Sequence, residues 1–183
     1  LMPYLYANAV NTHKTGIPMM RAMVVDFGSD RNTLTIDTQY MLGDSLLCAP
    51  VFSEDGECSF YLPDGGMWTD ILTGEMLQGG KWYTGKYDYF SMPLYAKPCS
   101  IIVFGNFKGK ADYDYTDGMK ICVYGISDGA SAETDVYDSH GQPAAHITAN
   151  RHGKELTVTV TGTDKPFTVE SPQGLDINIK CPT

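Results

Sequence analysis

The sequence predicts a mainly β fold, in which two β-sandwich domains follow the last β/α elements of a truncated α/β barrel. Residues Pro18–Phe27 form an almost unbroken apolar run, which is typical of a parallel strand covered on both faces. From about Ser45 onward, short apolar segments alternate with Gly- and Asp-rich turns, which is typical of β-sandwiches. The segment KELTVTVTG at residues 154–162 alternates between apolar and polar positions, as a half-buried strand does.

The opening residues predict a helix. Apolar residues recur at helical spacing over Leu1–Lys14, with basic residues in the last turn and Gly16 just beyond it. Leu1 offers no N-cap and the apolar stripe is already present there, so we expect the chain to begin within a longer helix. In the loop after the predicted strand, Asp30 and Asp37 are expected to serve as turn or helix-cap residues.

Two sets of β segments make up the rest of the chain. The first set occupies residues 45–105 and the second occupies residues 106–183. The polar stretch Asn106–Thr116 is interpreted as a linker or as the first turn of the second domain. The expected domains are therefore 1–44, the end of the barrel, followed by a proximal sandwich over 45–105 and a distal one over 106–183.

The charge balance argues against two classes of partner. Thirteen basic and 22 acidic residues give a net charge of −9 and a pI near 4.7. Nucleic acids and anionic membrane surfaces both require a basic patch, so neither is an expected partner. The acidic side chains are scattered, as on an ordinary soluble surface, and no apolar run reaches the ~20 residues of a membrane span.

The cysteines give no indication of a metal site. Five are present: Cys48, Cys58, Cys99, Cys122 and Cys181. They are widely spaced, whereas a zinc site needs close ligand pairs, so no metal and no cofactor is expected. An odd number of cysteines, most of them in apolar runs, favours a reducing compartment, and we expect a cytoplasmic location.

Two groups of residues resemble metal ligands only in part. The segment DYDYTDG contributes Asp112, Asp114, Asp117 and Gly118. Its third acidic residue falls one place late for an EF-hand, no glutamate follows at the required distance, and no helices flank it, so a turn is the better interpretation. The histidines recur every six residues, at His140, His146 and His152. They straddle a predicted turn and strand, so we do not expect them to converge on a metal.

Aromatic and glycine-rich segments leave one binding hypothesis open. Trp68, Trp82 and Tyr83 could form a sugar-stacking platform on a β-sandwich, although core packing or packing between domains is the favoured role. The glycine-rich segments PDGG and QGGK do not precede helices, so they do not predict a phosphate site.

Acid–base catalysis has one candidate residue. The sequence contains no HExxH, which excludes the zincin motif. Asp26 would lie at the carboxyl end of the predicted barrel strand, where such barrels place their active sites. Glycoside hydrolysis requires a pair of carboxyl groups, however, and no second member of a pair is evident.

Several segments together resemble one enzyme family. They are LMPYLY, HKTGIPMMRAM, DTQYMLGDSLLCAPVF and FYLPDGGMWTDILTGEMLQGGKWY. This combination resembles the C-terminal region of glycoside hydrolase family 31, which holds α-glucosidases and α-xylosidases, and it looks most similar to the bacterial α-xylosidase branch. The resemblance is dense over residues 1–105 and thinner in the remainder.

The resemblance implies a place in the family's fold for each segment. Leu1–Lys14 would be half of the helix before the last strand of a (β/α)8 barrel, Pro18–Phe27 that strand, and Asp37–Gly43 the closing helix. The family is retaining, and both of its catalytic aspartates precede the position of Leu1, as do its sugar-binding histidine and arginine. We therefore predict no catalytic residue here. Asp26 would be substrate-adjacent at most, and a structural role for it is favoured.

The expected function follows from this placement. The chain would be the C-terminal portion of a retaining α-glycosidase that cleaves α-xylosides or α-glucosides, completing and bracing the barrel but inactive alone. Its expected partners are the remainder of the same enzyme and, through the barrel, an α-linked oligosaccharide; the parent could also form a homo-oligomer. The alternatives are a stand-alone carbohydrate-binding module and a structural piece that docks on the barrel through residues 1–44.

Overall fold

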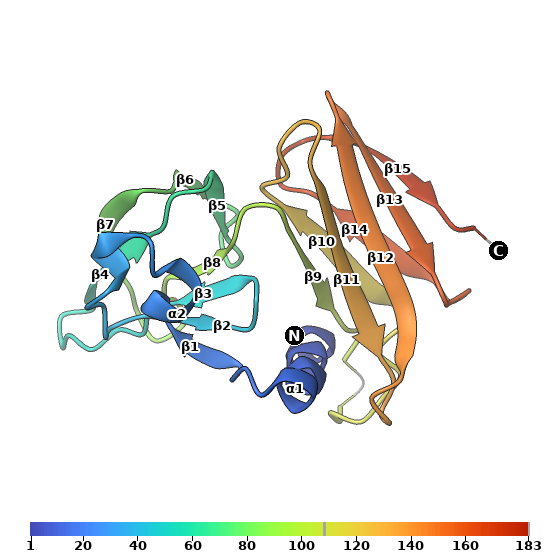
Figure 1. Ribbon diagram of the computed structural model, residues 1–183, viewed down its shortest axis with the longest axis horizontal. Coiled ribbons are helices and arrows are strands. Elements are labelled where there is room, and N and C mark those ends of the chain that lie inside the picture. The colour runs from blue at the N-terminus through green and yellow to red at the C-terminus, as the bar shows by residue number, and fades with distance from the viewer. Residues whose placement is uncertain (108, 183) are drawn as a thin grey trace. The chain divides into compact units, whose positions relative to one another are not determined.

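The computed structural model describes residues 1–107 and 109–182. Its contacts divide the chain into two compact units, unit 1 (Leu1–Ile17 with Cys99–Thr183) and unit 2 (Pro18–Pro98). Both consist mainly of β-strands, which confirms the predicted fold class (Figure 1). Of the helices in the described residues, none is long and apolar enough to cross a membrane.

Unit 2 contains an antiparallel sheet of six short strands and a separate hairpin. The sheet has the order β1-β2-β3-β8-β5-β6. The β4–β7 hairpin is a two-stranded antiparallel sheet whose long connection contains β5 and β6. The strands are β1 (Met20–Ala22), β2 (Tyr40–Leu42), β3 (Leu46–Cys48), β4 (Glu57–Leu62), β5 (Met67–Asp70), β6 (Met76–Gln78), β7 (Lys81–Lys86) and β8 (Leu94–Ala96). The short helix α2 (Met23–Phe27) and the 3-10 turn η1 (Arg31–Thr33) lie between β1 and β2.

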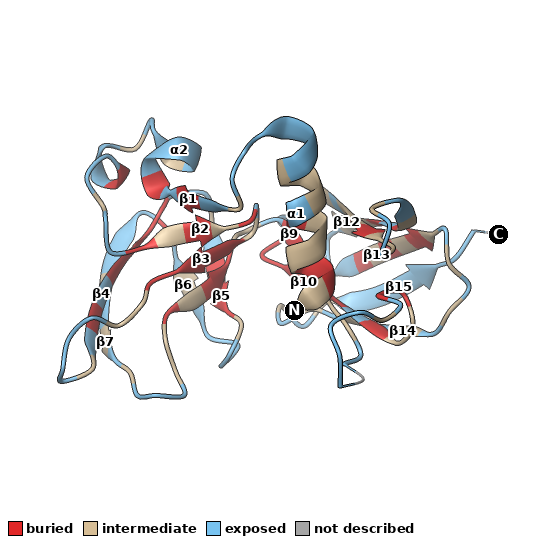
Figure 2. Ribbon diagram, turned by 90° about the horizontal axis from the view of Figure 1, so that it is seen from below, coloured by how far each residue is buried: buried red, intermediate tan, exposed pale blue. Residues whose placement is uncertain are grey.

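The core of unit 2 is rich in aromatic and methionine side chains. Its fully buried members include Met23, Met41, Phe60, Trp68 and Tyr95. The ring of Phe60 stacks on that of Tyr95, with centroids 5.2 Å apart, so the hairpin and the sheet bury a common aromatic layer. Figure 2 shows that buried positions gather on the strands of each unit rather than on its loops.

Unit 1 combines one helix with two sheets. The helix is α1 (Met2–Thr15). One sheet has the order β14-β10-β9 and the other β11-β12-β13-β15. The strands are β9 (Ser100–Phe104), β10 (Met119–Tyr124), β11 (Ser131–Tyr137), β12 (Pro143–His152), β13 (Glu155–Thr161), β14 (Phe167–Glu170) and β15 (Asp176–Lys180). Each sheet contains one parallel pair, β10 with β14 and β13 with β15, and its other pairs are antiparallel.

The core of unit 1 is aliphatic and follows the predicted alternation. Leu156, Val158 and Val160 of β13 are buried together with alternate residues of β9, β10 and β12, whereas Thr157 and Thr159 are not fully buried. Helix α1 packs on β9 and β11. Its prediction is confirmed, including its end, where Gly16 adopts the left-handed conformation (φ 78°) and donates its N–H to Thr12 O.

The predicted barrel strand over Pro18–Phe27 is wrong for most of its length. Only β1 is a strand; it pairs antiparallel with β2 alone, and the next five residues form α2. Met20 and Val25 are more than half exposed, so the run is not covered on both faces. An extended strand would separate residues 21 and 26 by roughly 17 Å. The ion pair between Arg21 and Asp26 therefore requires the chain to turn after β1.

The predicted helix over Asp37–Gly43 is also wrong. The segment contains β2, which pairs with β1 and β3, and Asp37 precedes a strand rather than capping a helix. Long-range contacts determine the conformation of this segment, because Gln39 donates from Nε2 to Tyr61 O (2.8 Å) and accepts from Tyr61 N at Oε1 (2.7 Å). The same residues therefore belong to a sheet.

The three expected domain ranges stay predictions about the parent protein. Within this chain, β9 lies in the range expected for the proximal sandwich, yet it hydrogen-bonds to β10 of unit 1. In the stretch Asn106–Thr116, Tyr115 is buried in the core of unit 1, which favours a domain's first turn over a linker.

Candidate functional site

The predicted site residue Asp26 lies on α2 and is held by one arginine. Arg21 is only 6% exposed, and its Nε donates to both carboxylate oxygens of Asp26 at 2.9 and 3.0 Å. The Asp26 side chain is a quarter exposed. Arg21 is the charged residue that interrupts the apolar run Pro18–Phe27. Because burying an unpaired charge is costly, its guanidinium requires hydrogen-bonding partners at this position.

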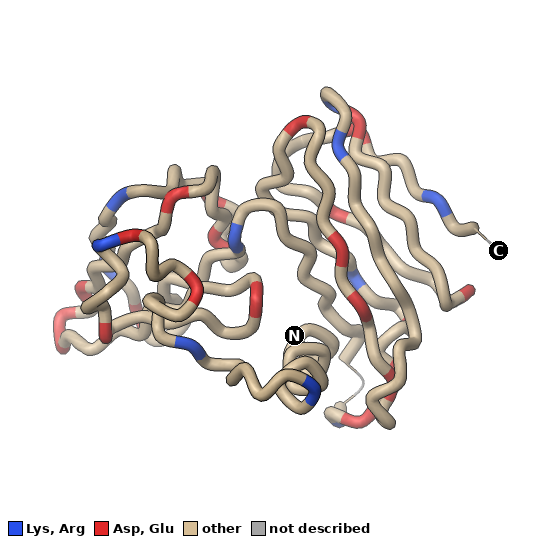
Figure 3. The backbone as a smooth tube through the Cα atoms, viewed as in Figure 1, with Lys and Arg blue, Asp and Glu red and all other residues tan. Residues whose placement is uncertain are grey.

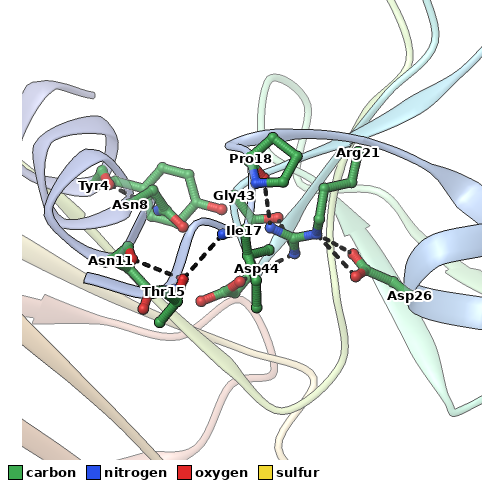
Figure 4. Close-up of polar contacts among 10 residues, drawn as sticks. All are labelled: Tyr4, Asn8, Asn11, Thr15, Ile17, Pro18, Arg21, Asp26, Gly43 and Asp44. Atoms are coloured by element: carbon green, nitrogen blue, oxygen red, sulfur yellow. Dashed lines mark hydrogen bonds and ion pairs between the residues drawn. The ribbon is translucent and has the colours of Figure 1, made fainter. Parts of the chain in front are cut away.

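The rest of the guanidinium joins the neighbouring backbone (Figure 4). Arg21 Nη1 donates to Pro18 O at 3.2 Å, and Nη2 donates to Gly43 O at 3.1 Å and to Asp44 Oδ1 at 3.0 Å. The hydrogen bond to Asp26 is the largest factor that raises the pKa of Arg21 above its ordinary value. A guanidinium with all three nitrogens bound ties the start of β1 to the turn after β2.

This arrangement is structural chemistry rather than acid–base chemistry. Both aspartates of the cluster point at a guanidinium, and the Asp26 carboxylate shares one N–H between its two oxygens. A retaining glycosidase needs two carboxyl groups facing a sugar from positions about 5–5.5 Å apart. The cluster therefore explains how the start of unit 2 is fixed, and contact between Asp26 and a substrate stays a prediction.

The segment DYDYTDG, which resembles a calcium loop in part, forms a turn in which a carboxylate accepts hydrogen bonds from the turn itself. Asp114 accepts hydrogen bonds from Thr116 N (3.0 Å), from Thr116 Oγ1 (2.7 Å) and from Lys165. These contacts, with Lys165 as the largest cause, lower the pKa of Asp114 to about 2. Within residues 1–107 and 109–182, no group of three or more His, Cys, Asp or Glu side chains is arranged to hold a metal ion.

The three histidines do not come together. His140 lies in the turn after β11, whereas His146 and His152 are six residues apart on β12, a separation of roughly 20 Å along a strand. His146 Nδ1 instead contacts Asp135 Oδ1 on the adjacent strand β11, at 2.7 Å. The prediction that they would not converge is confirmed.

One open cavity of about 840 Å³ lies at an end of unit 1. Its lining includes Asp112, Asp114, Asp138, Lys110 and Lys165. Two of these carboxylates already hold turns, since Asp138 accepts from the N–H groups of His140 and Gln142, and Asp114 is bound as described. The charges have mixed sign, and acidic positions elsewhere are also spread over both units rather than gathered in one segment (Figure 3).

The three aromatic candidates have different environments. Trp68 is 1% exposed and its Nε1 donates to Pro63 O at 2.8 Å, so it belongs to the core. Tyr83 is half-buried, stacks on Phe60 at 5.9 Å and donates to Gln78 O. Trp82 is 52% exposed. The favoured core role is confirmed for the first two, and Trp82 alone stays available on the surface.

A polar network beside Trp82 could not be found from the sequence. Tyr61 Oη donates to Asp30 Oδ2 at 2.6 Å and accepts from Asn32 Nδ2 at 3.2 Å. This bond from Tyr61 is the largest factor that lowers the pKa of Asp30. Asp30 also accepts from Asn32 N, so its expected turn role is confirmed. No local motif links residues about thirty positions apart, and only the tertiary contact between η1 and β4 reveals the network.

Two family models match the chain. One, described as the glycosyl hydrolase family 31 C-terminal domain, matches residues 16–102. The other, described as the C-terminal domain of the alpha-xylosidase YicI, matches residues 114–176. Together they cover most of both units.

Curated relatives and solved structures agree with these matches. The alpha-xylosidase XylQ of Lactiplantibacillus pentosus is 38% identical over 173 residues, which are 92% of this chain and 22% of that protein. An alpha-xylosidase of Saccharolobus solfataricus is 33% identical over 77% of this chain and 19% of its own length. The chain thus spans about a fifth of the curated relatives that it matches.

Among solved structures, the cycloalternan-forming enzyme of Listeria monocytogenes, in complex with a pentasaccharide substrate, matches with a TM-score of 0.80 and 29% identity. That match covers 92% of this chain and 17% of the enzyme. An alpha-xylosidase of Xanthomonas citri matches with a TM-score of 0.72 and 25% identity over 98% of this chain and 20% of its own.

Proposed function

The chain belongs to the C-terminal region of glycoside hydrolase family 31, and from this membership we propose that it is part of a retaining α-glycosidase that cleaves α-xylosides or α-glucosides. The observation that carries the proposal is the 38% identity to an alpha-xylosidase over 92% of the chain. Retaining chemistry requires one carboxyl group as nucleophile and another as acid. We assign neither role to a residue of this chain.

The role that we propose for the chain itself is to complete and brace the catalytic domain of the parent enzyme. The compact cores of units 1 and 2 support such a role, because each is a cluster of buried hydrophobic side chains. Asp26 would contribute by fixing Arg21, which supports its structural interpretation over direct contact with substrate. The end of the barrel at 1–44 and the sandwiches at 45–105 and 106–183 remain part of this proposal.

The partners that we propose are the remainder of the same enzyme and, through it, an α-linked oligosaccharide. Self-association of the parent enzyme stays a prediction. We also propose a cytoplasmic location, which is supported by the cysteines, since none of the five forms a disulfide.

A chimeric enzyme tests the bracing role. This chain would replace the matching C-terminal region of XylQ, and activity would be measured on 4-nitrophenyl α-D-xyloside. We expect the chimera to hydrolyse the xyloside, XylQ without its C-terminal region to lose activity, and the 183-residue chain alone to show no turnover. Turnover by the chain alone, or a chimera no more active than the shortened XylQ, would contradict the proposal.

A further inference from the structure

The outer face of the β4–β7 hairpin carries three facing pairs of side chains. In the antiparallel register, Tyr61 lies opposite Trp82, Ser59 opposite Thr84, and Glu57 opposite Lys86. Alternate residues of a strand share a face, so these three pairs lie in a row on one side of the hairpin. The intervening positions of β4 point the other way, into the core of unit 2.

The first pair places a large aromatic ring at the surface in a fixed position. Trp82 is 52% exposed, whereas Trp68, the other tryptophan, is 1% exposed. The rings of Trp82 and Tyr61 are tilted by 44° with centroids 5.4 Å apart, and Tyr61 is itself 3% exposed. Contact with the buried Tyr61 ring restricts the positions open to the indole, and such restriction lowers the entropic cost of binding.

Two polar side chains, those of Asp30 and Asn32, lie beside the aromatic pair and form a polar wall. Asp30 and Asn32, at the start of η1, both hydrogen-bond to Tyr61 Oη, at 2.6 and 3.2 Å. Asn32 is exposed, and its amide can both donate to and accept from a hydroxyl, while the Asp30 carboxylate can accept from one. Along the same face, the hydroxyls of Ser59 and Thr84 lie 2.7 Å apart.

The chemistry of this face selects a class of ligand. A pyranose ring has an apolar C–H face, which suits an indole, and a rim of hydroxyls, which suits hydroxyl, amide and carboxylate groups. Glu57 and Lys86 have opposite charges and lie opposite each other, so the far end of the row has no net charge. The Asp30 carboxylate beside Tyr61 adds a negative charge, which disfavours an anion, while the indole, amide and hydroxyl groups of the face match a neutral ligand that carries hydroxyls.

We propose that the outer face of the β4–β7 hairpin binds a neutral oligosaccharide, with Trp82 as its stacking platform and the hydroxyls of Ser59 and Thr84 as hydrogen-bonding groups. The choice of an α-linked oligosaccharide as ligand rests on the proposed function. The binding face itself is inferred from the side-chain contacts along β4 and β7 and does not rest on the proposed function.

Titration of the 183-residue chain tests this site. Maltotriose and a xyloglucan heptasaccharide would be added while heat is measured by calorimetry and tryptophan emission is recorded. We expect saturable binding with a Kd on the order of 1 mM, accompanied by a change in the emission of the exposed tryptophan. Trp82→Ala should raise the Kd about tenfold or more, and Thr84→Val should raise it roughly threefold.

Tyr89→Ala is the matched control, because Tyr89 is a fully exposed aromatic residue of unit 2 outside the hairpin, and it should leave the Kd unchanged. Absence of saturable binding, or equal losses in Trp82→Ala and Tyr89→Ala, would overturn the proposal. So would protection of Trp82 from acrylamide quenching in the XylQ chimera, since polypeptide would then cover the face. The titration does not depend on catalysis, so a negative titration would not contradict the proposed glycosidase function. An inactive chimera, in turn, would not contradict sugar binding measured by the titration.

Discussion

Units 1 and 2 are both β structures, but they are held together in different ways. The core of unit 1 consists mainly of aliphatic side chains on regularly alternating strands, such as β13. Unit 2 has an aromatic core and adds specific polar fixings, in which Arg21 anchors β1 and Gln39 joins β2 to β4. Unit 1 also has a polar clamp, in which Gln173 accepts from Ile126 N at 2.9 Å and donates to Ile126 O at 3.2 Å. The units therefore differ in their cores, because the alternation of β13 is visible in the sequence of unit 1, whereas the start of unit 2 is held by Arg21 and Gln39.

The largest expected effect tests the aliphatic side of this comparison. Leu156→Ala would remove a fully buried side chain of β13 and leave a cavity, which should cost unit 1 about 3 kcal/mol of unfolding free energy. Amide hydrogen exchange of β12 and β13 measures that loss. We expect the emission of Trp68, in the core of unit 2, to stay unchanged in the folded variant.

Thr157→Ala provides the control for this substitution, since Thr157 belongs to the same strand but to the other face. It should cost less than about 1 kcal/mol, because no core contact is lost. If both variants lost the same protection, the core of unit 1 would not depend on the alternation of β13.

The second prediction tests the polar fixing of unit 2. Arg21→Met keeps the apolar stem but leaves Pro18 O, Gly43 O and the Asp26 carboxylate without their donor. A fully buried pair would cost about 3–5 kcal/mol, but Asp26 is a quarter exposed and can be hydrated, so we expect about 2 kcal/mol. Urea unfolding followed by Trp68 emission measures it.

Arg31→Met, an exposed arginine of η1, is the matched control and should cost less than about 0.5 kcal/mol. Arg21→Lys should recover only part of the loss, because an ammonium group cannot reproduce the geometry of the guanidinium. If Arg21→Met were as stable as the wild type, the anchor would not contribute to the fold of unit 2.

The same comparison explains which elements the sequence could predict. Helix α1 has an amphipathic pattern and a glycine stop, and β13 has strict alternation, so both are visible locally. The run Pro18–Phe27 led to a wrong prediction, because its apolar residues suggest a buried strand, whereas the ion pair between Arg21 and Asp26 requires a bend within it. Residues 37–43 mislead in the same way, since Gln39 is paired with a strand more than twenty residues away.

The candidate site was predictable only in part. The sequence names Trp82 as a stacking candidate only together with Trp68 and Tyr83, and it favours a packing role for all three. Distinguishing Trp82 from Tyr83 requires the hairpin register, which places Trp82 opposite Tyr61 on the outer face and Tyr83 opposite Phe60 on the inner one. The contact of Asp30 and Asn32 with Tyr61 is a second long-range contact, between η1 and β4, which the sequence could not reveal either.

The smallest expected effect concerns the exposed contact between Asp114 and Lys165 in unit 1, which we expect to contribute little to the stability of that unit. Hydrogen bonds from Lys165 and Thr116 lower the pKa of Asp114 to about 2, below the ordinary value of about 3.9 that it regains on unfolding. Its stabilisation is therefore present above about pH 4 and is lost as the pH falls towards 2. Both Asp114 and Lys165 are nearly half exposed, so the contribution should stay below about 1 kcal/mol.

Asp114→Asn should consequently lower the stability of unit 1 slightly at pH 7 and make the loss of stability between about pH 4 and pH 2 shallower. Thermal unfolding at a series of pH values measures this slope, and Asp112→Asn, a neighbouring carboxylate of the same turn, is the control. Because Asp128 and Asp138 also have lowered pKa values through backbone hydrogen bonds, part of the acid sensitivity should persist in every variant. If stability changed with pH equally in Asp114→Asn and in the control, the contact with Lys165 would not stabilise unit 1 in solution. If Asp114→Asn lowered the unfolding free energy more than Arg21→Met does, the contrast between the two units would be reversed.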